Sequence, residues 1–181
     1  NESELAQLIG VSRNTVKKSL LKLEREHLVE IVENKGATVK SHTLDEILNY
    51  MEIREVLEGL VARRAAAAIS DAQLRNLEDI VGQMADCLQN NRLDEYSNLN
   101  RRFHQVIYES SDNQQAVEMI NIIKTQLLRY HIRTILVPGR DRESLEEHRY
   151  MLESLQARDA MLAEQQTRWH IANIRNTIQT H

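Results

Sequence analysis

The side chains best suited to chemistry are three histidines, His104, His148 and His170, each on the apolar side of a helical pattern. Neutral imidazole nitrogens are good ligands for divalent transition metals such as Zn²⁺ and Ni²⁺. If the three apolar faces converge inside a bundle, the histidines can form one metal site with positions left for water or a ligand. The alternative is that each is a hydrogen-bonded histidine of the core.

Other reactive groups form no catalytic constellation. There is no H-E-x-x-H pattern and no nucleophile motif, so the sequence favours a protein that is not an enzyme; a metallohydrolase with three histidine ligands is the less favoured alternative. Arg54 lies on the apolar face of its expected helix and needs an anionic partner. That partner is either Glu58, one turn later, or the carboxylate of an effector, and the pair with Glu58 is the favoured interpretation.

The histidines lie in a region, from Thr43 onward, for which the sequence predicts only helices. Thr43 to Glu46 and Ser70 to Gln73 have the form of capping boxes, which open helices. The helices that they open are expected to run to about residues 69 and 89, and four more lie near 94–110, 114–136, 141–157 and 159–179. Breaks are expected at Asn90-Asn91, Ser111-Asp112-Asn113, Pro138-Gly139 and Arg158-Asp159. Six helices with short connections describe a compact all-α bundle.

The first 41 residues follow another pattern. A short helix is expected to end at Gly10, in the left-handed conformation, and Ser12 has the chemistry of an N-cap for a second helix. The β-compatible segments Leu28 to Val32 and Ala37 to Lys40 then flank a turn. Helix, turn, helix and hairpin in this order predict a winged helix-turn-helix.

The second of these helices begins with a basic run, in which the stretch from Arg13 to Lys22 holds four cations and no acid. A recognition helix places its N-terminal residues at base edges in the major groove, where Arg13 can bind guanine and Asn14 can bind adenine or a phosphate. For the run alone, the alternative is a solvated helix face. The predicted DNA contacts are Ser12, Arg13, Asn14, Thr15, Lys17, Lys18, Lys35 and Gly36.

The segments Glu4-Leu5-Ala6, Gly10-Val11-Ser12-Arg13, Val16-Lys17, Leu23-Glu24 and Asn34-Lys35-Gly36 resemble the DNA-binding domain of the GntR family of regulators. The resemblance implies that Arg13 and Lys17 touch the operator and that Gly36 approaches the minor groove. Ser3 and Lys17 stand where the family often has arginine, and lysine lacks the bidentate fork of that side chain. Domains of this family begin with a further helix, so the resemblance also implies that the domain is truncated at its N-terminus here.

The segments Asn100-Arg101-Arg102-Phe103-His104, Glu146-Glu147-His148, Asp159 and Trp169-His170 resemble the FCD effector domain of the FadR-type GntR subfamily. Many members bind a metal through three histidines and an Asp, or sometimes an Asn, four residues before the first. The resemblance implies these roles for Asn100, His104, His148 and His170, with a neutral oxygen at Asn100 where a charged one is commoner. Some relatives bind an acyl-thioester without metal, which the intact histidine trio disfavours here.

These patterns predict a mainly α protein of two domains: residues 1–41, a partial winged helix-turn-helix, and residues 42–181, an all-α six-helix bundle for effector binding and dimerisation. The expected function is a ligand-responsive regulator, with a repressor favoured and an activator as the alternative. It is expected to bind double-stranded operator DNA as a homodimer, because one recognition helix makes too few contacts for tight specific binding. The expected effector is a small organic or sugar acid at a divalent metal, zinc or nickel, and Arg54 is a further candidate effector contact. The alternative is a regulator that senses the ion itself.

The net charge and composition agree with the prediction of a DNA-binding regulator. A net charge of −4 argues against indiscriminate binding to nucleic acid, although a local basic surface remains compatible with it. No apolar run reaches the ~20 residues that span a bilayer. The single cysteine, Cys87, excludes an intrachain disulfide and fits a reducing cytoplasm. Cys87 and Trp169 are expected in the core.

Overall fold

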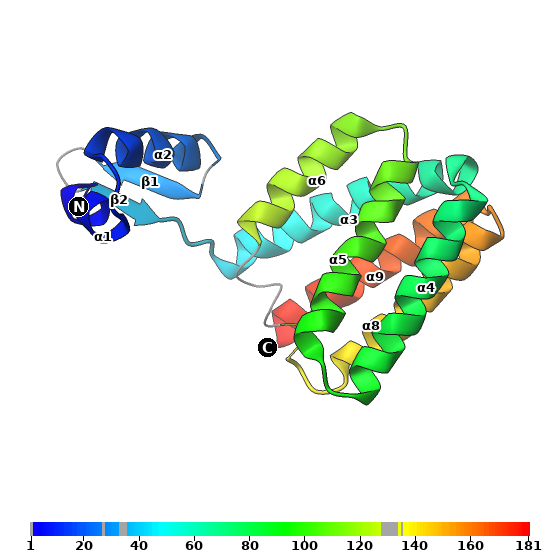
Figure 1. The fold of residues 1–181 in the computed structure, drawn as a ribbon. Coiled ribbons are helices and arrows are strands. Elements are labelled where there is room, and N and C mark those ends of the chain that lie inside the picture. Colours follow the sequence, from blue (N-terminus) through cyan, green and yellow to red (C-terminus); the bar gives the residue numbers. More distant parts are fainter. Residues whose placement is uncertain (1, 27, 33–35, 128–133, 135) are drawn as a thin grey trace. The chain divides into compact units, whose positions relative to one another are not determined.

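The computed structural model describes residues 2–26, 28–32, 36–127, 134 and 136–181, and it divides the chain into two compact units, Asn1–Thr43 and Leu44–His181 (Figure 1). One predicted DNA contact, Lys35, lies outside the described residues. None of the helices that the described residues form combines the length and the hydropathy needed to cross a membrane.

The first unit is a pair of helices followed by a hairpin. In chain order it contains α1 (Glu2–Ile9), α2 (Arg13–Arg25), β1 (Val29–Val32) and β2 (Gly36–Val39). Gly10 has a φ of 70°, the left-handed conformation that favours glycine after a helix. Ser12 caps α2, because its hydroxyl accepts the N–H of Thr15 at 3.1 Å. The strands pair antiparallel with Val29 opposite Val39, so the predicted order of elements is confirmed.

The second unit is all helical in its described residues. It contains α3 (Leu44–Ala68), α4 (Asp71–Gln89), α5 (Leu93–Ser110), α6 (Gln114–Gln126), α8 (Arg140–Gln156) and α9 (Ala160–Thr180). Ser70 and Gln73 form the predicted capping box at the start of α4. Asn91 and Arg158 take the left-handed conformation at two predicted breaks, each with a φ of 53°. Asp159 caps α9 by accepting the backbone N–H groups of Met161 and Leu162.

Two expectations need correction. The helix expected near 114–136 ends at Gln126, and the sequence holds no Gly or Pro between residues 114 and 137 to mark that end. Trp169 is 45% exposed rather than buried. Adjacent residues of a helix point about 100° apart, so the complete burial of His170 turns Trp169 outward, where its ring packs against Tyr150.

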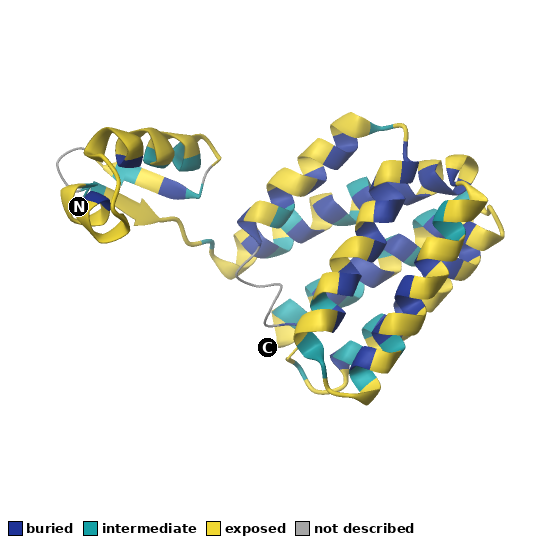
Figure 2. Cartoon of the chain, in the orientation of Figure 1, coloured by how far each residue is buried: buried dark blue, intermediate teal, exposed yellow. Residues whose placement is uncertain are grey.

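The core lies between helices that are distant in sequence. α3 packs along α9, α4 packs on α5 and α8, and α3 also touches α5 and α6. Buried positions form stripes on the inward faces, as Figure 2 shows, and their side chains are mainly Ile, Leu, Val, Ala and Met. This packing places polar residues of α3, α5, α8 and α9 together inside the bundle.

Candidate functional site

Three histidines from three helices meet in the middle of the bundle. His104 of α5, His148 of α8 and His170 of α9 are each at most 3% exposed, and one ring nitrogen from each lies within 4.8 Å of the others. Tetrahedral Zn–N bonds of about 2.0–2.1 Å place two ligand nitrogens roughly 3.4 Å apart. The three rings are therefore grouped around one point, but they must draw closer together to share an ion.

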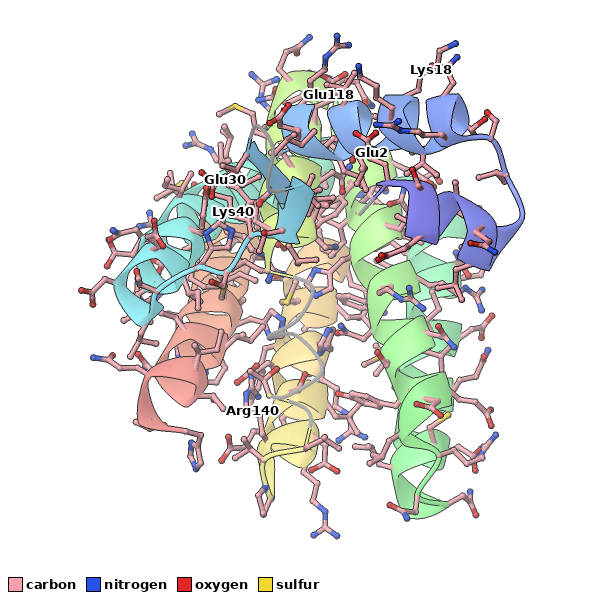
Figure 3. The ribbon with its side chains drawn as sticks, turned by 90° about the vertical axis from the view of Figure 1, so that its left-hand side faces the viewer. Glu2, Lys18, Glu30, Lys40, Glu118 and Arg140 are labelled. Atoms are coloured by element: carbon pink, nitrogen blue, oxygen red, sulfur yellow. The ribbon has the colours of Figure 1, made fainter. Side chains whose placement is uncertain are left out.

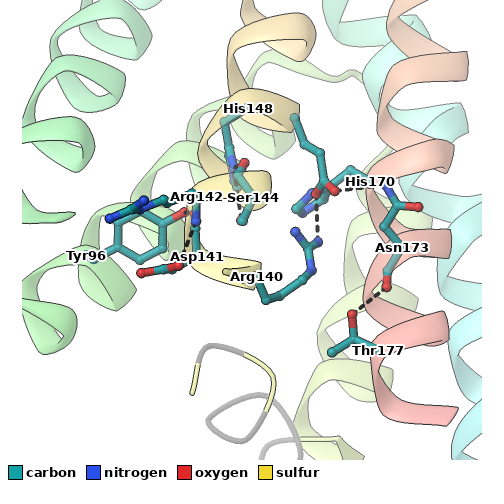
Figure 4. Close-up of polar contacts among 10 residues, drawn as sticks. Tyr96, Arg140, Asp141, Arg142, Ser144, His148, His170, Asn173 and Thr177 are labelled. Carbon is teal, nitrogen blue, oxygen red and sulfur yellow. Dashed lines mark hydrogen bonds and ion pairs between the residues drawn. The ribbon is translucent and has the colours of Figure 1, made fainter. Parts of the chain in front are cut away.

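The hydrogen bonds of His148 and His170 fix which nitrogen faces inward. Nδ1 of His148 donates to the backbone carbonyl of Ser144 at 2.5 Å, and Nδ1 of His170 donates to the Glu147 carboxylate at 2.6 Å (Figure 4). Both partners are acceptors, so each Nδ1 carries the proton of the neutral ring and each Nε2 keeps a lone pair. Both Nε2 atoms are buried and have no partner among the described residues.

A second glutamate stands beside the third histidine. Nδ1 of His104 lies 3.3 Å from Oε2 of Glu58, without hydrogen-bond geometry. The other oxygen of Glu58 accepts Nε of Arg54 at 2.5 Å, and both residues are buried. Arg54 therefore has the structural partner that the sequence favours. Both carboxylates next to the trio are thus engaged by cations or histidines.

Burial keeps the three rings neutral. It lowers the pKa of His104 and of His170 to about 4, in spite of the neighbouring glutamates, and that of His148 to about 3. Burial alone would raise the pKa of Glu58 and of Glu147, but the cations and hydrogen bonds around each carboxylate lower it below its ordinary value. Neutral imidazoles beside ionised carboxylates are the protonation states that a cation site requires.

Asn100 lies one turn before His104 on α5. It is 7% exposed, and its Oδ1 is buried without a hydrogen-bond partner in the described part of the chain. Asn100 and His170 line the same small cavity, together with Tyr96, Ser144 and Arg140. The four residues singled out by sequence are therefore buried, polar and gathered in one region, and Asn100, His148 and His170 each keep an acceptor atom without a partner in the described part of the chain.

Sequence reasoning missed the roles of Glu147 and Arg140. Arg140 is buried and donates through Nη2 to Oε2 of Glu147 at 2.7 Å, the same oxygen that His170 contacts. The available signal was the spacing along α8, since Arg140, Ser144 and His148 recur every four residues and so share one face.

The predicted DNA contacts of the first unit are accessible. Ser12, Arg13, Asn14, Thr15, Lys17 and Lys18 are all exposed, and Gly36 is half-buried with a φ of 95°. Lys18 projects outward from α2 in Figure 3. Val16 is buried and anchors the helix from its other face. Nε of Arg13 pairs with Glu2 at 3.1 Å.

Comparison with known proteins identifies the family of each unit. Residues 1–39 match the model of the bacterial regulatory proteins of the gntR family, and residues 49–173 match that of the FCD domain. The HTH-type transcriptional repressor RspR of Escherichia coli (strain K12) is 27% identical over 98% of this chain and 78% of its own. The Uxu operon regulator of Haemophilus influenzae is 25% identical, over 96% of this chain and 71% of its own.

A solved structure agrees with the fold. E. coli McbR/YncC superposes with a TM-score of 0.81 at 22% identity, covering 99% of this chain and 86% of that one. The FCD match alone covers more than half of the 181 residues. The chain therefore belongs to the GntR family of transcription regulators, which are not enzymes, in the group whose second domain is an FCD domain.

Proposed function

We propose that this regulator is a ligand-responsive repressor whose helical unit holds a divalent metal, zinc or nickel, through Asn100, His104, His148 and His170. The observation that carries the proposal is a group of buried acceptor atoms without partners among the described residues, which includes Nε2 of His148, Nε2 of His170 and Oδ1 of Asn100. Buried polar atoms are rarely left unpaired in folded proteins, and a bound ion is one of the few explanations for a cluster of them.

The donor set fits such an ion. Three neutral nitrogens and one amide oxygen suit zinc or nickel better than calcium or magnesium, which prefer oxygen ligands. Glu147 and the carbonyl of Ser144 orient two of the rings through Nδ1, the arrangement that outer hydrogen bonds give to metal-binding histidines. When bound, the ion supplies a Lewis acid to which an oxygen of a small acid can bind.

The first unit supplies the DNA contacts of the proposal. Arg13, Asn14 and Lys17 lie at the exposed start of α2, as the recognition helix of a winged helix-turn-helix requires. A homodimer would present two such helices to a pseudo-palindromic operator. RspR is named as a repressor, and this supports the same sign of regulation here.

Regulation follows from linkage between the two sites. A carboxylate that binds the helical unit better in one dimer geometry shifts the protein toward that geometry, and operator affinity changes accordingly. Release from the operator upon binding of a carboxylate is the expected direction for a repressor. A metal sensor would instead release the operator with the ion alone.

Elemental analysis of the purified full chain tests the metal. We expect about one zinc or nickel per chain, and a chelator should lower the unfolding temperature by several degrees. His148→Gln removes one proposed ligand and should abolish both effects, whereas His181→Gln, at an exposed position, should retain them. A chain that holds no transition metal and ignores the chelator contradicts the metal site.

Fluorescence anisotropy with a duplex selected from random sequence tests the DNA contacts. Lys17→Ala should weaken binding and reduce the slope of log affinity against log salt by about 1, the loss of one phosphate contact. Arg142→Gln removes a cation from the exposed surface of the other unit and should leave affinity and slope unchanged. If no duplex is selected, or if binding does not depend on salt, the DNA-binding part fails.

A further inference from the structure

Arg13 is the only arginine among the predicted DNA contacts, and the other cations among them are lysines. Lysine carries a compact charge, whereas the planar guanidinium of arginine matches the O6 and N7 acceptors of guanine with two hydrogen bonds. Bidentate binding of guanine by these residues therefore depends on Arg13. The way in which its guanidinium is held then decides how well one base pair is distinguished from another.

Glu2 contacts Arg13 from the neighbouring helix. Glu2 is the first residue of α1 and Arg13 the first residue of α2, and the two helices pack together. Oε2 of Glu2 accepts Nε of Arg13 at 3.1 Å. The Glu2 side chain is 26% exposed, whereas that of Arg13 is 72% exposed. The carboxylate is thus partly enclosed by its own unit, while the guanidinium stays accessible to DNA.

The nitrogen that Glu2 contacts matters for base recognition. The structure records no hydrogen bond from Nη1 or Nη2 of Arg13 to another described residue. These two terminal nitrogens can donate together to O6 and N7 of guanine while Nε stays with Glu2. The pair with Glu2 is therefore compatible with DNA binding, and it restricts the rotation of the side chain before DNA arrives.

We propose that Glu2 is a positioning residue, which orients Arg13 for a bidentate contact with one guanine of the operator. The proposal rests on the DNA-binding part of the proposed function. Glu2 also brings a negative charge toward the DNA phosphates, which repel it whatever the base sequence. The two effects differ in what they change: orientation strengthens binding only where the guanine is present, whereas repulsion weakens binding to every duplex.

The test uses a duplex selected from random sequence with the full chain. Each guanine is replaced in turn by 7-deazaguanine, which lacks the N7 acceptor. The guanine that Arg13 contacts is the one whose replacement weakens binding of the unaltered chain but not of Arg13→Ala. The affinity for this duplex, divided by the affinity for the same duplex with an A·T pair at that position, measures discrimination.

We expect Glu2→Ala to lower this ratio about three- to tenfold, the effect of having to order one side chain on binding. Glu2→Gln keeps an oxygen that accepts Nε without the negative charge, so its ratio should lie between those of Glu2→Ala and the unaltered chain. In the Arg13→Ala background, Glu2→Ala should leave the ratio unchanged, because the residue through which Glu2 acts is absent.

Glu30→Ala is the matched control, since it removes an exposed carboxylate from β1 of the same unit and should leave the ratio unchanged. Circular dichroism shows whether each variant is folded. The proposal is overturned if folded Glu2→Ala changes both affinities by the same factor, or if it lowers the ratio equally in the Arg13→Ala background. If no guanine depends on Arg13, the proposal is overturned while the DNA-binding part of the proposed function stands. If no duplex is selected, both fail.

Discussion

The two sides of the histidine trio are built from the same three residue types. On one side Arg54 of α3 pairs with Glu58, which lies beside His104; on the other Arg140 of α8 pairs with Glu147, which accepts Nδ1 of His170. We call these the Arg54 chain (Arg54, Glu58, His104) and the Arg140 chain (Arg140, Glu147, His170). All six residues are buried.

The chains differ in how completely their hydrogen bonds are satisfied. Glu147 accepts from Arg140, His170 and Asn173, whereas Glu58 has Arg54 at 2.5 Å and His104 at 3.3 Å. Arg140 keeps two nitrogens without a described partner, and no buried nitrogen of Arg54 is left so. In the Arg54 chain, Glu58 therefore depends on Arg54 for its hydrogen bond. In the Arg140 chain, Glu147 has three donors, and two nitrogens of Arg140 remain without a described partner.

Acid should weaken the Arg54 chain and the Arg140 chain together. It should therefore cause the largest change in the free energy of unfolding. The ordinary histidine pKa is about 6.5, and burial lowers it to about 4, 3 and 4 for His104, His148 and His170. Between pH 6.5 and 4 the unfolded chain then binds more protons than the folded one, so stability falls as pH falls. The lowered pKa values of Glu58 and Glu147 act in the same direction at still lower pH.

Urea unfolding of the chelator-treated chain at several pH values measures this effect. Trp169 is the only tryptophan, so its fluorescence reports the helical unit alone. We expect the free energy of unfolding to decline steadily from pH 6.5 to pH 4. His148→Leu, which removes one titrating ring, should make the decline shallower. A free energy that stays level over this range contradicts the neutral, buried state of the trio.

Replacing Arg54 and Arg140 in turn should show that the Arg54 chain and the Arg140 chain contribute unequally to stability. Arg54→Gln removes the cation that is hydrogen-bonded to buried Glu58, and breaking such a buried pair costs about 3–5 kcal/mol. Arg140→Gln leaves Glu147 with His170 and Asn173 as donors, so we expect a smaller loss of about 1.5–3 kcal/mol, that of a single hydrogen bond to a charged group. Urea unfolding at pH 7, monitored by Trp169, gives both values. Equal losses would contradict the assigned difference between the chains.

The contrast between the Arg54 chain and the Arg140 chain also shows which residues and contacts can be predicted from the sequence. His104, His148 and His170 were found because each polar residue interrupts an apolar helical face, and the capping residues Ser12 and Ser70 were found because their hydrogen bonds are local. The pair of Arg54 and Glu58 was found for the same reason, since it spans a single turn of α3.

The Arg140 chain was not found, because two of its contacts join α8 to α9 and depend on packing between helices. Arg140 directly follows Pro138-Gly139 and precedes the helix expected near 141–157, so the sequence pattern assigns it to no helical face. The end of α6 was missed because no glycine or proline marks it. Residue patterns thus predict the buried faces of helices and the residues that cap them. Hydrogen-bond partners on other helices can be identified only from the tertiary structure.

The two glutamates should differ in their effect on the metal. Glu147→Gln weakens the acceptor that orients His170 at 2.6 Å, and loss of such an outer contact typically lowers metal affinity 10–100-fold. Glu58 lies 3.3 Å from His104 without hydrogen-bond geometry, so Glu58→Gln should lower affinity less. Competition for zinc against a chelator of known affinity gives both values.

Glu146→Gln is the matched control for this comparison. Glu146 precedes Glu147 on α8, but it is exposed and pairs with Arg149 at the surface. Exposed ion pairs contribute about 0–1 kcal/mol, so neither zinc affinity nor stability should change measurably. If Glu146→Gln weakened zinc as much as Glu147→Gln, the effect would come from lost charge in general. If Glu58→Gln weakened it more than Glu147→Gln, the Arg54 chain would be the one that positions the ligands, and the assignment of the two chains would be reversed.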